Sequence, residues 1–323
     1  MKINNLPEIP FELSMHGLII AIAVLAGVIF ASMLGRSIGM HKGSVRSYSI
    51  LAILLGLVFS RAAYCALFWN EFEADITKII AVTDGGFTLS GAFLGAFIAA
   101  LIYSAVSRTR LSKLFNAIIP AAALAIAIGR FSAFFTMEDC GGVIENANWC
   151  MFPLGIYDSN EGVWHYAVFA YEALGALVAA LAGFLTVTFK SELRFSRGEN
   201  AAAITLMFYA VPQMIFETLR TDIIWLGFVN LNQALAAVLA IIGFVVLSVA
   251  SVKHVNFGFS HALRWLMGLG LLGLAFKSQF RVSAENELTS YFMLILTMAA
   301  FLLVGCTLSL SFLNSKNKQK LMI

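Results

Sequence analysis

The sequence predicts an all-α polytopic membrane protein. Of its 323 residues, 60% are hydrophobic and only 12% are charged, whereas a soluble domain is about half apolar and about a quarter charged. Apolar stretches of about 20 residues recur along the chain, and each is long enough to cross a ~30 Å hydrocarbon core as a helix. These observations exclude an ordinary soluble domain. With a net charge of only +3, no nucleic-acid partner is expected.

Nine spans are expected, each bounded by charged or turn residues. They cover residues 17–35, 48–69, 86–107, 114–136, 163–189, 201–219, 229–251, 258–276 and 290–313. The first is expected to be a mature helix rather than a cleaved signal peptide, because Glu8 and Glu12 precede it in place of a basic leader. With no linker or soluble segment between the spans, we expect a single membrane domain.

Basic residues collect in alternate connections. Arg36, Lys42 and Arg46 follow the first span, and similar groups follow the third, fifth, seventh and ninth spans. The second and fourth connections instead carry acidic residues and few bases, as at Glu73 and Asp75. Because positive loops stay in the cytoplasm, the pattern predicts an external amino terminus and a cytoplasmic carboxy terminus. An odd number of spans agrees with this orientation.

Polar groups concentrate in the outer halves of the spans. At ~1.5 Å per residue, Arg61 and Arg130 both lie roughly 10 Å below the outer surface. Ionisable groups in lipid are costly and usually face a cavity, and guanidinium groups bind phosphate bidentately. The sequence therefore predicts an outer cavity suited to an anionic lipid headgroup. The other polar or glycine positions at this depth are Asp84, Gly85, Gly86, Ser90, His165, Glu172, Gln213, Glu217 and Arg220.

Several of these residues also have a purely structural interpretation. Arg61 and Arg130 can extend toward the interface while their stems stay in lipid. Glu217 and Arg220 are three residues apart on one helix face, so they can form a local ion pair that anchors the helix end. His165 can be solvated or can cap a helix. Convergence of the set on one site is what would favour function.

The sequence contains few residues that could form a metal site or a disulfide. The remaining histidines are scattered without metal-ligand spacing, so no metal site is expected. Cys140 and Cys150 share the second outer connection, where an oxidising exterior would allow one disulfide.

Five stretches, taken in order, resemble the prolipoprotein diacylglyceryl transferases of bacterial membranes. The similarity covers roughly residues 16–250. The matching stretches are Ser60-Arg61-Ala62-Ala63-Tyr64, Asp84-Gly85-Gly86 with Ser90, Gly129-Arg130-Phe131 continuing to Glu138, Tyr171-Glu172, and Tyr209 with Gln213, Glu217 and Arg220. The resemblance implies a core over residues 1–251, followed over residues 252–323 by two additional helices and a cytoplasmic tail.

The resemblance also implies an activity in the bacterial plasma (inner) membrane. A diacylglyceryl group would pass from phosphatidylglycerol to the lipobox cysteine of a lipoprotein precursor, with no cofactor. Arg130 would stabilise the phosphate, and the general base would be Glu172, His165 or Glu217. The substrates would contact Arg61, Tyr64, Asp84, Gly85, Gly86, Ser90, Glu138, Tyr209, Gln213 and Arg220.

The chain departs from the family's motifs at several polar positions. Ser90 stands where many members have histidine, Ala133 and Thr136 replace asparagines, and Gln213 replaces an arginine. Two alternatives therefore stay open. One is a catalytically inactive protein that binds lipid or lipoprotein on the same fold. The other is a transporter, which the crowding of polar groups into one leaflet and the lack of repeated halves disfavour.

Overall fold

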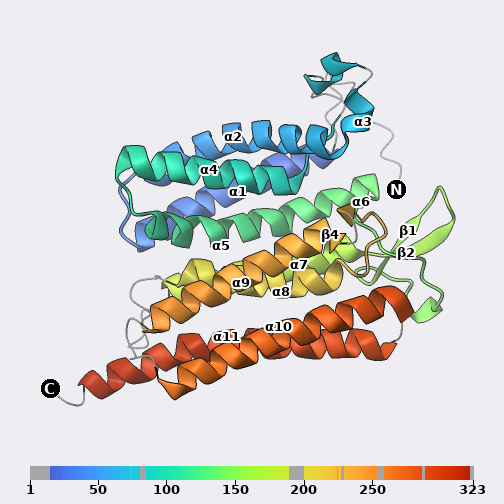
Figure 1. Cartoon of the computed structure of the whole chain (residues 1–323). Coiled ribbons are helices and arrows are strands. Elements are labelled where there is room, and N and C mark those ends of the chain that lie inside the picture. The colour runs from blue at the N-terminus through green and yellow to red at the C-terminus, as the bar shows by residue number, and fades with distance from the viewer. Residues whose placement is uncertain are drawn as a thin grey trace.

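The protein is a bundle of long helices that run side by side (Figure 1). The computed structural model describes residues 15–73, 75–80, 85–188, 200–223, 225–226, 229–252, 258–285 and 288–320. In this part of the chain, eight helical segments are long and apolar enough to cross a membrane, and a shorter apolar helix accompanies them. Each of the nine expected spans thus has its helix, and the prediction of an all-α multi-pass membrane protein is confirmed. The orientation of the termini stays a prediction.

The bundle is built from long apolar helices. They are α1 (Met15–Ser37), α2 (Ser44–Leu67), α4 (Leu89–Ser107), α5 (Leu111–Gly129), α7 (Val168–Thr188), the shorter α8 (Ala201–Phe216), α9 (Leu231–Val252), α10 (Phe259–Glu285) and α11 (Leu288–Lys320). The fourth span continues from α5 through the 3-10 turn η3 (Arg130–Ser132) into α6 (Ala133–Thr136). The short elements between spans are α3 (Trp69–Phe72), η1 (Ile76–Ile79), η4 (Ala147–Trp149), and the strand pairs β1 (Gly155–Asp158) with β2 (Val163–Tyr166) and β3 (Trp225–Leu226) with β4 (Val229–Asn230).

Small residues let the helices pack closely. Helix α2 packs on α4, while α5 packs on α1, α7 and α8. A Cβ atom added at Gly95 of α4 would lie 2.6 Å from the Leu55 carbonyl carbon of α2, and Ala99 one turn later is fully buried. Small residues on this face of α4 therefore serve helix packing.

The fifth span begins later than expected. Residues 163–166 form strand β2 rather than the first turn of a helix, and β2 pairs antiparallel with β1, so that Ile156 lies opposite His165. Aromatic and β-branched side chains in this stretch suit a strand, and Gly162, with a φ of +72°, allows the turn that precedes it. The expected span over residues 163–189 therefore divides in two: residues 163–166 belong to the β1–β2 hairpin, and helix α7 begins at Val168.

The two carboxy-terminal helices form their own pair on one side of the bundle. Helices α10 and α11 pack on each other, and α11 also contacts α8 and α9 (Figure 1). Met207 of α8, Phe244 of α9 and Phe301 of α11 share one buried apolar cluster. Both helices extend past the expected spans, because charged residues end the apolar run without ending the helix. The domain division after residue 251 stays a prediction.

The four cysteines are free thiols. Cys140 is buried and its Sγ lies 3.7 Å from the Glu138 carbonyl oxygen, while Cys150 Sγ lies 3.7 Å from the Asn146 carbonyl oxygen. The disulfide that the sequence allowed is therefore not formed.

Candidate functional site

One end of the bundle, which we call the hairpin end, carries the β1–β2 hairpin (Figure 1). A cluster of charged side chains gathers at this end. Arg130 begins the tight turn at the end of α5, and Glu172 lies in the first turns of α7. Gln213 and Glu217 lie at the end of α8, and Arg220 follows three residues later. An isolated β-bridge between Gly141 and Arg220 holds the chain after α8 against the chain after α6. Residues far apart in sequence thereby meet at one place.

Arg130 is held by two carboxylates. Its Nη1 pairs with Asp139 Oδ2, and its Nε lies 3.0 Å from Glu172 Oε2. The buried Tyr209 hydroxyl lies beside the same guanidinium. Only 13% of the Arg130 side chain is exposed, and its guanidinium is enclosed by these partners.

Arg220 meets four carboxylates. Its Nη2 pairs with Asp139, and Asp222 accepts from its Nε at 3.1 Å and its Nη2 at 2.6 Å. Its Nη1 lies 3.7 Å from Glu172 and 3.6 Å from Glu217. Burial alone would lower the pKa of Arg220, but the carboxylates raise it above its usual value. The guanidinium stays charged, and the expected Glu217–Arg220 pair is one contact in a larger network.

Asp139 joins the two guanidiniums. One of its carboxylate oxygens contacts Arg130 and the other contacts Arg220. Its side chain is 20% exposed, and its backbone has a φ of +57°. We refer to Asp139 with Arg130, Glu172, Gln213, Glu217 and Arg220 as the arginine cluster. Asp139 was missed as a site residue because its neighbour Glu138 carries the family resemblance, yet Glu138 is exposed.

Gln213 links the two glutamates of the arginine cluster. Its Nε2 donates to Glu172 Oε1 at 2.5 Å and to Glu217 Oε1 at 3.2 Å, and all three side chains are buried. This chain thus places a neutral donor between two carboxylates. The second oxygen of Glu217, Oε2, has no hydrogen-bond partner among the described residues. Glu172 Oε2 also has no hydrogen-bond partner there, but it lies 3.0 Å from Arg130 Nε, so Glu217 Oε2 is the one of the two that we consider as a proton acceptor.

Arg61 belongs to a different group of contacts. It donates to the backbone carbonyls of Gly85 at 2.6 Å and Gly86 at 3.0 Å, and to those of residues 78 and 79 at 2.7 and 3.1 Å. Its guanidinium also lies 5.8 Å from the ring of Tyr64. Gly86 has a φ of +77°, and a Cβ there would overlap Arg61. Arg61 therefore positions the loop before α4. Ser90 lies in the first turn of that helix, and Asp84 lies outside the described residues.

His165 lies on the hairpin. Its Nδ1 is 3.0 Å from the Gly141 carbonyl oxygen, and its Nε2 is 3.2 Å from Glu161. The ligand atoms of Asp158, Glu161 and His165 lie within 4.8 Å of one another, a grouping that the sequence spacing did not suggest. Glu161 is 64% exposed and already pairs with His165, so we assign no metal there.

The fold and the arginine cluster define a multi-pass membrane protein with buried, paired guanidinium groups at one end of its bundle. The profile of the prolipoprotein diacylglyceryl transferase family matches residues 5–249. The chain therefore belongs to this family. Helices α10 and α11 lie beyond the matched residues.

Curated relatives agree with this assignment. The chain is 29% identical over 244 residues to the phosphatidylglycerol–prolipoprotein diacylglyceryl transferase of Bacillus cytotoxicus, which covers 74% of this chain and 87% of the relative. It is 26% identical over 254 residues to the enzyme of the same name from Limosilactobacillus reuteri, covering 76% and 90%. For the Staphylococcus haemolyticus enzyme of that name the identity is 25% over 252 residues, covering 76% and 86%.

Proposed function

We propose that this protein transfers a diacylglyceryl group from phosphatidylglycerol to the lipobox cysteine of a lipoprotein precursor in the bacterial plasma membrane. One observation carries the proposal: Arg130 and Arg220 point at a single bridging carboxylate. Two guanidinium groups around one anion are suited to hold a phosphate. Family membership and the names of the relatives support the same reaction.

During the reaction, negative charge increases on the phosphate group. The precursor's cysteine sulfur attacks the glyceryl carbon that bears the phosphate, a carbon–sulfur bond forms, and the carbon–oxygen bond breaks. The electron pair leaves with the oxygen, so a singly charged phosphodiester becomes glycerol phosphate with an additional negative charge. Cations held in place beforehand stabilise that added charge without reorganising. This is the role we assign to Arg130 and Arg220.

Asp139 occupies the place that the phosphate would take. The two guanidiniums face Asp139, Glu172, Glu217 and Asp222, so the arginine cluster carries more acidic than basic groups. An incoming phosphodiester would meet repulsion unless one carboxylate moved away. Asp139 is the candidate, because it contacts both guanidiniums and lies on a partly exposed loop between α6 and η4. We assign it the role of a displaceable counterion.

Glu217 is our candidate for the general base. The incoming thiol must lose its proton, and Glu217 Oε2 has no hydrogen-bond partner among the described residues. Glu172, whose carboxylate contacts both guanidiniums and Gln213, acts as a positioning residue. His165 is the alternative base, although both of its ring nitrogens have partners on the hairpin.

The protein's own cysteine does not compete with the substrate thiol. Burial, reinforced by Asp139, Asp222 and Asp158, raises the pKa of Cys140 to about 11. At neutral pH this thiol stays protonated and is a poor nucleophile. The nucleophile therefore comes from the precursor, and the proposed chemistry needs no cofactor.

The test is a transfer assay in detergent. Purified protein is incubated with phosphatidylglycerol and a lipobox peptide, and the peptide mass is followed. We expect addition of a diacylglyceryl mass that disappears with Arg130→Ala and with a peptide in which alanine replaces cysteine. Arg110→Ala, an exposed arginine at the other end of α5, is the matched control and should leave transfer unchanged. Transfer that survives Arg130→Ala would contradict the proposed site.

A second candidate function is a lipid-binding protein without catalysis. The replacements Ser90, Ala133, Thr136 and Gln213, together with the neutralised arginines, favour it. It predicts Arg130-dependent binding of phosphatidylglycerol and no change in peptide mass. A transporter, in contrast, would require sealed vesicles to show activity, whereas a transferase works in detergent.

A further inference from the structure

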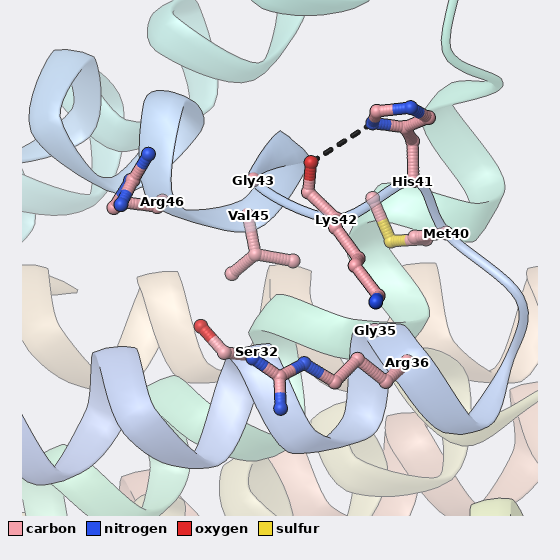
Figure 2. Close-up of a pocket in the computed structure, with 9 residues that line it drawn as sticks. All are labelled: Ser32, Gly35, Arg36, Met40, His41, Lys42, Gly43, Val45 and Arg46. Carbon is pink, nitrogen blue, oxygen red and sulfur yellow. Dashed lines mark hydrogen bonds between the residues drawn. The ribbon is translucent and has the colours of Figure 1, made fainter.

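A second polar region lies around the α1–α2 connection, at the end of the bundle opposite to the arginine cluster. We call this end of the bundle the turn end. Ile38, just after α1, packs near Ala117 early in α5, whereas Ala23 of α1 lies near Gly129 at the far end of α5. Here a cavity of about 310 Å³ opens (Figure 2). Its lining residues are Ser32, Gly35, Arg36, Met40, His41, Lys42, Gly43, Val45 and Arg46.

Three cationic residues, Arg36, Lys42 and Arg46, line the cavity. Among the described residues, no acidic side chain lines it. Figure 2 shows Arg36 and Lys42 extending into the same space, with Arg46 beyond Val45. All three are exposed, and none forms an ion pair with a described residue. Like charges gathered around one space repel each other unless an anion or solvent screens them. The cavity therefore has the electrostatics of an anion site.

Helix α2 adds to this potential. It begins at Ser44, and the preceding Gly43 offers no side-chain hydrogen bond to its first N–H groups. The amino-terminal end of a helix carries a partial positive charge and favours phosphate. The electrostatic potential at the turn end is therefore positive for two reasons, the backbone N–H groups that begin α2 and the three cationic side chains.

The shape of the connection is set by its sequence. Gly39 and Gly43 have φ values of +75° and +93°, which glycine adopts without strain. A Cβ at Gly35 would lie 2.7 Å from Val45 Cγ2, so a larger residue would push α1 and α2 apart. His41 Nδ1 lies 2.8 Å from the carbonyl oxygen of the next residue, Lys42 (Figure 2). The cations are thus carried on a tightly packed turn.

We propose that this cavity binds the phosphate group of an anionic ligand. The connection lies at the predicted cytoplasmic end of two spans, where phospholipid headgroups sit. The phosphate can therefore come from an anionic phospholipid of the inner leaflet or from a soluble phosphate ester. The site is independent of the proposed transferase activity, because it uses other residues at the other end of the bundle.

The test removes the three cations together and compares two sources of phosphate. Arg36→Gln, Lys42→Gln and Arg46→Gln are combined in one variant. The matched control combines Arg108→Gln, Arg110→Gln and Lys113→Gln, which remove the same charge from the α4–α5 connection and the first turn of α5. In one arm, native mass spectrometry counts phosphatidylglycerol retained from mixed phosphatidylglycerol–phosphatidylcholine nanodiscs. In the other, calorimetry in detergent measures binding of glycerol 3-phosphate.

We expect the cavity variant to lose affinity about tenfold or more in at least one arm, and the control variant to keep it. A loss confined to the nanodisc arm identifies a lipid headgroup, and a loss confined to the calorimetric arm identifies a soluble ester. The proposal is overturned if the cavity variant binds in both arms as the unmodified protein does, or if the control loses as much. Arg36→Lys with Arg46→Lys keeps the charge and should retain binding, which separates loss of charge from loss of fold.

Discussion

The two ends of the bundle use the same residue type in opposite ways. At the hairpin end, Arg130 and Arg220 are buried and each meets several carboxylates. At the turn end, Arg36 and Arg46 are exposed and pair with no acidic residue among those described. A buried charge must have a counterion in the protein, whereas an exposed charge can take one from solvent or lipid. The hairpin end must therefore release a carboxylate before it holds phosphate, and the turn end need not.

The largest expected effect comes from removing Arg220. Arg220→Ala should lower the rate of transfer about 100-fold or more, because one of two cations that stabilise the leaving phosphate is lost. Peptide mass after a fixed time measures this. Arg264→Ala on α10, far from the arginine cluster in sequence, should leave the rate within twofold. Equal losses in the two variants would contradict the special role of the hairpin end.

Glu217→Gln should act on the chemical step. Loss of the proton acceptor should lower kcat about 100-fold with little change in KM. Glu172→Gln should instead raise KM, because both guanidiniums lose a positioning contact. Steady-state kinetics with both variants separates the roles. If Glu217→Gln keeps full kcat, the base is another residue, and His165→Gln is the next variant to measure.

Asp139→Asn should make the hairpin end behave more like the turn end. With the bridging charge removed, the two guanidiniums lose the one anion that they share most closely, and binding of glycerol phosphate should tighten about tenfold. The same change should lower the free energy of unfolding by about 1–3 kcal/mol, since the ion pairs are lost. Glu138→Gln, at the exposed neighbour, is the control and should change neither quantity. Unchanged or weaker binding in Asp139→Asn would show that Asp139 is not a displaceable counterion.

The smallest expected effect is on Cys140. Asp139 helps to raise the pKa of this thiol to about 11, so Asp139→Asn should lower that pKa and increase the thiolate fraction. Alkylation of Cys140 at pH 8 should then become a few times faster. Alkylation of Cys150 in the same sample is the internal reference and should not change. An unchanged ratio of the two rates would mean that Asp139 does not contribute to the raised pKa of Cys140.

Much of the fold was predictable from the sequence. Long apolar runs and charged boundaries predict the number and approximate ends of the helices, because the lipid core requires a fixed span length. The strand at residues 163–166 was not predicted, because this short stretch runs directly into the apolar sequence of α7, and periodicity alone does not separate a four-residue strand from the start of a helix. The hairpin becomes visible only through its pairing with β1.

The candidate site was predictable in part. Depth in the membrane placed Arg130, Glu172, Glu217 and Arg220 in one leaflet, and the structure brings these four together. Depth in the membrane does not say which helices are neighbours, so Arg61 was grouped with Arg130. In the structure, α2, which carries Arg61, packs on α4, whereas α5, which ends at Arg130, packs on α1 and α7. Asp139 was missed because a loop carboxylate next to exposed residues carries no periodic signal.

The most direct measurement compares transfer by variants of the two ends. Lipobox peptide and phosphatidylglycerol are incubated in detergent with unmodified protein, with Arg130→Ala, and with the variant that lacks the three turn-end cations. We expect a diacylglyceryl mass on the peptide with the unmodified protein and with the turn-end variant, and none with Arg130→Ala. Full transfer by Arg130→Ala, or loss only in the turn-end variant, would contradict the assignment of the reaction to the arginine cluster.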